Sequence, residues 1–138
     1  MASTQAAECP FRGLSESRAV LVVDDSGYSR LRTRRLLAEE GFTRILEAEN
    51  GDDALVVFEK ESPALVLIDQ VMRGKEGIEV SRLLLERDPL ARVAILTVLS
   101  DPEIHWRARK AGAIAVVNKN NQETLRFLLR TEKGRFAQ

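Results

Sequence analysis

The chain contains the stretch Ala19-Val20-Leu21-Val22-Val23-Asp24-Asp25, in which five apolar residues are followed directly by two carboxylates. A second stretch, Ala64-Leu65-Val66-Leu67-Ile68-Asp69, has the same pattern and ends in one aspartate. Short runs of Val, Leu and Ile are typical of strands buried on both faces of a parallel sheet. Because the carboxyl ends of such strands line a ligand crevice, the three aspartates are expected to meet there.

Three carboxylates that meet repel one another and raise one another's pKa unless a cation lies between them. Mg²⁺ prefers hard oxygen ligands and is the first candidate for that cation. The pattern therefore predicts a metal-dependent phosphoryl site built on Asp24, Asp25 and Asp69.

Apolar runs and helical patterns alternate along the whole chain. The runs predict five strands, at 19–23, 44–48, 64–68, 93–97 and 114–117. Cap residues and helical spacing predict five helices, at 26–40, 50–61, 76–86, 100–112 and 120–130, with Ser100-Asp-Pro-Glu103 as the capping box of the fourth. This alternation predicts an α/β doubly wound domain with helices on both faces of the sheet. We place the domain at 18–131, after a flexible leader (1–17) and before a short polar tail (132–138).

Composition narrows the classes of function. The 138 residues suffice for one domain with a core, and 21 acidic and 21 basic residues give zero net charge. Zero net charge argues against direct nucleic-acid binding, which depends on neutralising phosphates. No apolar run approaches the ~20 residues of a membrane span, so we expect no membrane association. Cys9, the only cysteine, excludes an internal disulfide and fits a cytoplasmic location.

Two further polar residues stand at predicted strand ends. Thr97 closes the fourth apolar run, and Lys119 follows the fifth. In order and spacing, the chain from 18 to 131 resembles a response-regulator receiver domain, the phospho-acceptor of two-component signalling. The matching elements are Val23-Asp24-Asp25-Ser26, Leu67-Ile68-Asp69-Gln-Val-Met72, Gly77, Ile95-Leu96-Thr97, and Ala111-Gly112-Ala113 followed by Lys119.

The resemblance implies a flavodoxin-like (βα)5 fold with strand order 2-1-3-4-5. It implies that Asp69 accepts a phosphoryl group as an acyl phosphate. It also implies that Asp25, Asp69 and the backbone carbonyl of Val71 bind Mg²⁺, with Mn²⁺ as a second candidate, while Asp24 acts through metal-bound water. The implied phosphoryl donor is a sensor histidine kinase or a histidine phosphotransfer protein.

The same resemblance implies that Lys119 and Thr97 contact the phosphoryl group. Lys119 would place a positive charge against the phosphoryl oxygens, and the Thr97 hydroxyl would hydrogen-bond to them. Beyond self-catalysed transfer and slow autodephosphorylation, we expect no enzymatic activity.

The chain departs from the family pattern at four positions. Arg73 and Asn120 stand where proline is usual, so a cis peptide bond after Lys119 is not expected. Val98 replaces a small residue, and Val116 replaces the aromatic switch residue of the fifth strand. Without that ring, the relay from the site to the output surface must differ from the usual aromatic coupling.

Helical spacing predicts which side chains of the last two helices face outward. The residues expected to pack on the sheet are Ile104, Ala108, Ala111, Leu125, Leu128 and Leu129. With these residues on the inner side, Trp106 and Phe127 face outward. The resemblance places these helices on either side of the strand that carries Val116, a surface used for dimers or downstream partners. We therefore expect output by protein contact there; the alternative is that Trp106 folds back over the domain edge.

Three questions stay open at this level. The departures are compatible with an interaction module that works without phosphorylation, although all five site residues are retained. A haloacid-dehalogenase-like phosphohydrolase also uses Asp, Thr or Ser, Lys and Mg²⁺, but it carries Asp-x-Asp after its first strand, whereas Asp24 and Asp25 are contiguous here.

Finally, the basic residues of the first helix form either a solvated face or part of a donor-docking surface; they are Arg30, Arg32, Arg34 and Arg35.

Overall fold

The computed structural model describes residues 19–136. The predicted leader and Cys9 lie outside the described residues. Five strands form one sheet in which every neighbouring pair is parallel, in the order β2-β1-β3-β4-β5. Their bounds are β1 Val20–Val23, β2 Ile45–Ala48, β3 Leu65–Asp69, β4 Arg92–Thr97 and β5 Ala115–Asn118. The predicted fold class and strand order are confirmed.

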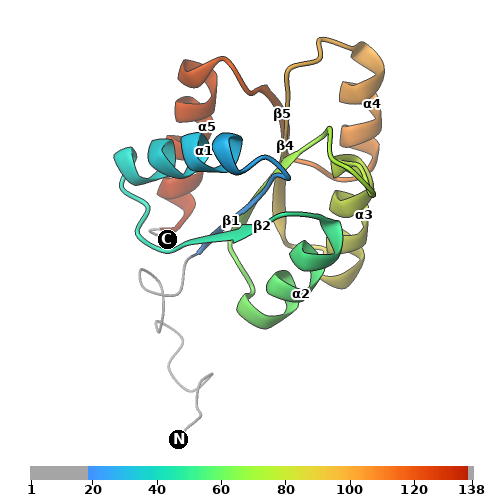
Figure 1. The fold of residues 1–138 in the computed structure, drawn as a ribbon, viewed down its shortest axis with the longest axis horizontal. Coiled ribbons are helices and arrows are strands. Elements are labelled where there is room, and N and C mark those ends of the chain that lie inside the picture. The colour runs from blue at the N-terminus through green and yellow to red at the C-terminus, as the bar shows by residue number, and fades with distance from the viewer. Residues whose placement is uncertain (1–18, 137–138) are drawn as a thin grey trace, which may run out of the picture.

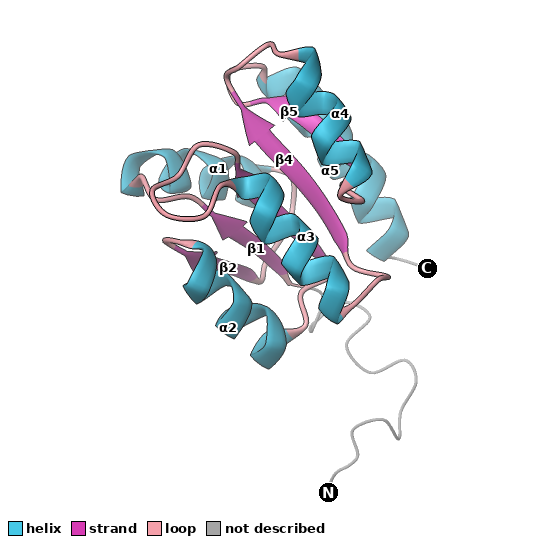
Figure 2. Cartoon of the chain, turned by 90° about the vertical axis from the view of Figure 1, so that its right-hand side faces the viewer, coloured by secondary structure: helices cyan, strands magenta, loops and turns pink. Residues whose placement is uncertain are grey.

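Within residues 19–136, five helices alternate with the strands and cover both faces of the sheet (Figure 1). Their bounds are α1 Gly27–Glu39, α2 Gly51–Glu61, α3 Gly77–Arg87, α4 Pro102–Lys110 and α5 Gln122–Phe136. Helices α2, α3 and α4 lie on one face, and α1 and α5 lie on the other (Figure 2). All residues of β1 and β3 are buried, because each of these strands has a neighbour on both sides and helices above and below.

Side-chain caps fix where most helices begin. Ser26 caps α1 by accepting the N–H of Ser29, and Asn50 caps α2 by accepting that of Asp53, as predicted. The predicted cap of α4 is displaced by one residue: the Asp101 carboxylate, rather than Ser100, accepts a backbone N–H, that of Glu103. A cap at Asp101 places Pro102 in the first turn, where its missing N–H costs nothing.

Helix α5 is longer than predicted. We expected it to end near Arg130, with a polar tail from 132, but it continues to Phe136. The additional turn is held by tertiary contacts: Glu132 is only 2 % exposed, and its Oε1 accepts a hydrogen bond from Arg92 Nε at 2.6 Å. The ring of Phe136 meets that of Phe42 edge-on, with centroids 5.6 Å apart. Residues 132–136 therefore belong to the folded domain.

Candidate functional site

The carboxylates of Asp24, Asp25 and Asp69 meet at the carboxyl edge of the sheet. Asp24 and Asp25 follow β1, and Asp69 is the last residue of β3, the neighbouring strand. One carboxylate oxygen from each lies within 4.8 Å of the others. Asp24 and Asp69 are buried, whereas Asp25 is more open to solvent. The sequence-predicted cluster is thus present, and it has the all-oxygen composition that Mg²⁺ prefers.

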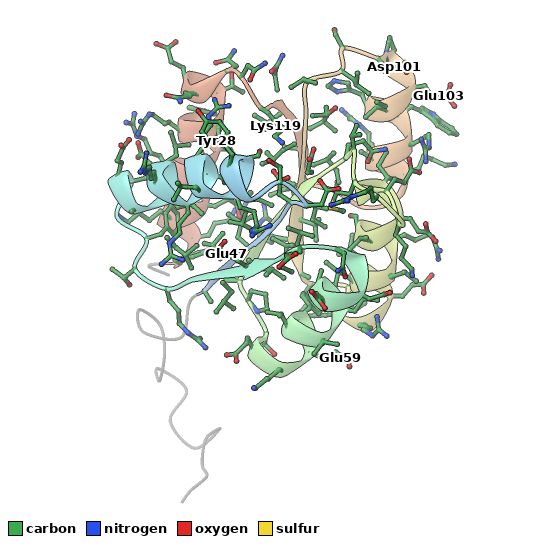
Figure 3. All side chains as sticks on the ribbon, in the orientation of Figure 1. Tyr28, Glu47, Glu59, Asp101, Glu103 and Lys119 are labelled. Atoms are coloured by element: carbon green, nitrogen blue, oxygen red, sulfur yellow. The ribbon has the colours of Figure 1, made fainter. Side chains whose placement is uncertain are left out.

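Lys119 bridges two of these carboxylates. Its Nζ lies 3.0 Å from Asp24 Oδ2 and 3.2 Å from Asp69 Oδ2. Its backbone N–H donates to the carbonyl of Thr97, which fixes the end of β5 beside the end of β4. Figure 3 shows Lys119 at this edge of the molecule, near the start of α1. A single ammonium group therefore forms ion pairs with two buried carboxylates.

The surroundings shift the pKa of Asp69 upward. Burial is the largest cause, because a charged carboxylate loses its hydration; the Coulombic attraction of Lys119 opposes the shift, and the negative charge of Asp24 adds to it. Asp69 Oδ1 also lies 3.4 Å from the backbone N of Val71. Positive groups of the chain therefore balance the negative charge of Asp69 only in part.

Asp25 is compensated separately, by Arg73. The backbone N–H of Arg73 donates to Asp25 Oδ2 at 3.0 Å, and Arg73 Nε lies 3.4 Å from the same oxygen. The backbone hydrogen bond is the largest cause of a lowered pKa of Asp25, and the guanidinium adds to it. A proline at this position would have no N–H to donate.

The start of α1 holds Asp24 in place. Asp24 Oδ1 accepts the N–H of Ser26 at 2.9 Å, and its backbone carbonyl accepts a hydrogen bond from Arg30 Nη1 at 2.8 Å. Arg30 and Arg34 both pair with Glu47 of β2. Two of the four arginines of α1 are therefore engaged within the domain.

The loop after β3 is folded tightly against Asp69. Gly77 begins α3, and a Cβ there would lie 2.5 Å from the backbone oxygen of Asp69. The buried side chain of Gln70 accepts the N–H of Ile78 at 2.9 Å and donates to Glu76 Oε1 at 2.8 Å, while Glu76 pairs with Arg107 of α4. We did not predict the role of Gln70 from sequence; the only signal was a polar residue directly after a buried strand.

Thr97 lies buried at the end of β4, at the same edge of the sheet. Its Oγ1 accepts the N–H of Leu99 at 3.0 Å, so the hydroxyl holds the following loop. Beyond it, Val98 and Leu99 are exposed, as is Val71 after β3. The described peptide bonds, including the one after Lys119, are all trans, as expected.

The predicted outward-facing aromatic residues are exposed. Trp106 on α4 is 60 % exposed and Phe127 on α5 is 73 % exposed, while Ile104, Leu125 and their inner neighbours pack on the sheet. Lys110 Nζ lies 5.0 Å from the centre of the Trp106 ring. Val116 is half-buried and packs against the core cluster under α2, α3 and α4. Trp106 therefore does not fold back as core.

The family model of the response regulator receiver domain matches residues 20–130. This chain is a member of that family. A chemotaxis protein CheY from Halobacterium salinarum is 36 % identical over 107 residues, which cover 78 % of this chain and 88 % of that protein. Protein CcdB from Bacillus subtilis is 35 % identical over 105 residues, covering 76 % and 88 %. This receiver domain is therefore similar to relatives of comparable length.

Solved receiver structures have the same fold as this receiver domain. A CheY-like receiver domain protein from Methanospirillum hungatei has a TM-score of 0.75 at 26 % identity, covering 86 % of this chain and 93 % of that one. The BeF3-activated DrrB receiver domain has a TM-score of 0.69 at 30 % identity, covering 86 % and 95 %.

Family membership defines the class of function. Receiver domains act in two-component signalling, bind Mg²⁺ at an acidic pocket, and interact with histidine kinases and downstream effectors. The dehalogenase alternative has no support from these matches. Within residues 19–136, no helix is long and apolar enough to cross a membrane.

Proposed function

We propose that Asp69 of this receiver domain accepts a phosphoryl group in a Mg²⁺-dependent reaction and that the change is transmitted by protein contact. The observation that carries the proposal is the position of Lys119, whose Nζ contacts both Asp24 and Asp69 within a cluster of three carboxylates. A lysine in this position is suited to hold the oxygens of a phosphoryl group bound to Asp69.

The residues of the cluster fit a divalent cation. Three carboxylates face Lys119 and the more distant guanidinium of Arg73, which leaves the site short of positive charge. Asp25, Asp69 and the backbone carbonyl of Val71 would hold Mg²⁺ or Mn²⁺, and Asp24 would act through a water ligand. When bound, the ion would neutralise charge on the transferring phosphoryl oxygens.

The chain's own groups have distinct tasks in the transfer. An oxygen of Asp69 forms the new bond to phosphorus while the bond from phosphorus to the donor's imidazole nitrogen breaks, and that nitrogen keeps the bonding electrons. As negative charge passes from the carboxylate to the phosphoryl oxygens, the Lys119 ammonium exchanges its contact with Asp69 for one with those oxygens. The hydroxyl of Thr97 turns from the loop toward the same oxygens, which releases its contact with the N–H of Leu99.

A phosphorylation assay with phosphoramidate tests this function. Wild-type protein should gain acid-stable, hydroxylamine-sensitive label in the presence of Mg²⁺ and lose it when EDTA is added. Asp69→Asn should gain none. Asp52→Asn is the matched control, because Asp52 is an exposed carboxylate on α2 outside the cluster. Absence of label on wild-type protein would favour the interaction module that works without phosphorylation.

We further propose that a sensor histidine kinase or a phosphotransfer protein supplies the phosphoryl group and that α4, β5 and α5 form the output surface. Trp106 on α4 and Phe127 on α5 are exposed, and Lys110 lies against the Trp106 ring; exposed aromatic residues beside basic ones are typical of binding hot spots. Trp106→Ala should weaken phosphorylation-dependent dimer or partner binding by about 1–3 kcal/mol.

Tyr28→Ala is the control for association, because Tyr28 is also an exposed aromatic residue but lies on α1. The phosphorylation rate of Trp106→Ala should match that of wild type. Unchanged association of Trp106→Ala would place the output surface elsewhere.

A further inference from the structure

Arg73 lies at the rim of the acidic site, in the loop between β3 and α3. Both its backbone N–H and its Nε contact one oxygen of Asp25, Oδ2, at 3.0 and 3.4 Å. The side chain of Arg73 extends into solvent and is 89 % exposed. Among the residues that the structure describes, Asp25 is its one recorded ionic partner.

Because of this contact, each carboxylate of the site has a basic partner within the chain. Lys119 serves Asp24 and Asp69, and Arg73 serves Asp25. The two basic residues differ in freedom: Lys119 is mostly enclosed, whereas the guanidinium of Arg73 can leave by rotation of its own side chain.

We propose that Arg73 competes with the divalent cation for Asp25 and so lowers the affinity of this receiver domain for Mg²⁺. The inference rests on the proposed function, since it assumes that Asp25 is a metal ligand. A metal bound through Oδ2 needs the guanidinium to leave. A metal bound through the other oxygen places two positive charges on one carboxylate, and they repel each other.

The size of the effect follows from the exposure of the pair. Exposed ion pairs contribute ~0.2–1 kcal/mol, so removal of the guanidinium should lower the Kd for Mg²⁺ by a factor of roughly 1.4 to 5. By linkage, Mg²⁺ must weaken the Arg73–Asp25 contact by the same factor.

Calorimetric titration of the full chain with MgCl₂ tests the inference, with wild type, Arg73→Ala, Arg73→Lys and Arg82→Ala compared at low salt. Arg73→Ala keeps the backbone N–H and removes only the guanidinium, and it should bind Mg²⁺ more tightly. Arg73→Lys should lie between it and wild type, because it keeps the charge. Arg82 pairs with Glu86 on α3, and Arg82→Ala controls for loss of net positive charge.

Thermal unfolding supplies a second measurement that needs no phosphoryl donor. In EDTA, Arg73→Ala should melt below wild type, because Asp25 has lost its contact with the guanidinium, and saturating Mg²⁺ should raise its melting temperature by more than that of wild type. Equal Kd values for wild type and Arg73→Ala, or an equal shift in Arg82→Ala, would overturn the inference. Failure of wild type to bind Mg²⁺ would instead overturn the metal-dependent function itself.

Discussion

At the scale of single residues, the site is defined by how its charges are compensated. The raised pKa of Asp69 means that ionising this carboxyl costs more in the folded chain than in the unfolded one. Its destabilising contribution is complete above the raised pKa and disappears as the pH falls below the ordinary value of 3.8. Asp25 behaves in the opposite way: its lowered pKa contributes stability above 3.8 that is lost as the pH falls through the lowered value.

The raised pKa of Asp69 predicts that Asp69→Asn stabilises the protein when no divalent cation is present. In EDTA at pH 7 the variant should melt at a higher temperature than wild type, because the neutral amide avoids the cost of a buried charge. The gain should shrink as the pH is lowered through the raised pKa of Asp69. Thermal melts followed by circular dichroism at a series of pH values measure it. A melting temperature below that of wild type at pH 7 would show that the Lys119 contact outweighs the burial cost.

Gly77 gives a second prediction at this scale. Gly77→Ala would force a methyl group against the backbone oxygen of Asp69, and nothing flexible can yield there. We expect a loss of about 1–3 kcal/mol in the free energy of unfolding, measured by urea denaturation. Gly134→Ala is the matched control, because the same methyl group on α5 meets nothing within 4 Å. That variant should be neutral or gain roughly 0.5–1 kcal/mol.

The site residues that follow strands could be predicted from sequence, whereas the loop residues could not. Asp24 and Asp69 come directly after apolar runs, and Lys119 stands two residues after one. Parallel pairing brings the ends of such runs to one edge of the sheet. The contacts of Gln70 and Arg73 depend on how the loop after β3 folds. No periodic pattern encodes that conformation, so only the structure reveals it.

At the scale of elements, the apolar runs located all five strands. The inner strands β1, β3 and β4 are buried and have nearly continuous apolar sequence, whereas the edge strand β2 is more exposed and its run includes Glu47. The end of α5 was misplaced because Thr131-Glu132-Lys133-Gly134 is polar and contains a glycine. In the folded chain, Arg92 of β4 binds Glu132, and this long-range contact overrides the local sequence.

Removal of the residues after Thr131 tests whether the last turn of α5 belongs to the folded domain. A chain ending at Thr131 should lose about 2–4 kcal/mol of stability, because it lacks the Glu132–Arg92 pair and the contact of Phe136 with Phe42. Urea denaturation measures the loss. The point variant Glu132→Ala should show a smaller loss, which separates the ion pair from the aromatic contact. An unchanged unfolding midpoint in the truncated chain would mean that the last helical turn adds no stability.

At the scale of the whole molecule, the surfaces around the site predict a long-lived phosphorylated state. The resemblance to receiver domains also implies that, in fast members of the family, polar side chains at the positions of Val71 and Leu99 orient the attacking water. Here both are exposed and apolar, and Val98 beside them is β-branched. Water can reach the acyl phosphate, but no side chain from these positions orients it.

We therefore expect slow autodephosphorylation, with Val71→Asn shortening the lifetime by on the order of tenfold. Loss of label after removal of the donor, in Mg²⁺ and without a phosphatase, measures the lifetime. Val56→Asn, at an exposed valine on α2, is the control. A half-life of seconds in wild-type protein would contradict the prediction.

The central claim is that Asp69 itself becomes phosphorylated, and chemical mapping of the labelled residue tests it most directly. Borohydride reduces an aspartyl phosphate to homoserine, and peptide mass spectrometry then identifies the modified position. After treatment with phosphoramidate and Mg²⁺, we predict homoserine at position 69 and none in samples prepared with EDTA. Homoserine at any other position, or none at 69 in protein that carries label, would contradict the account.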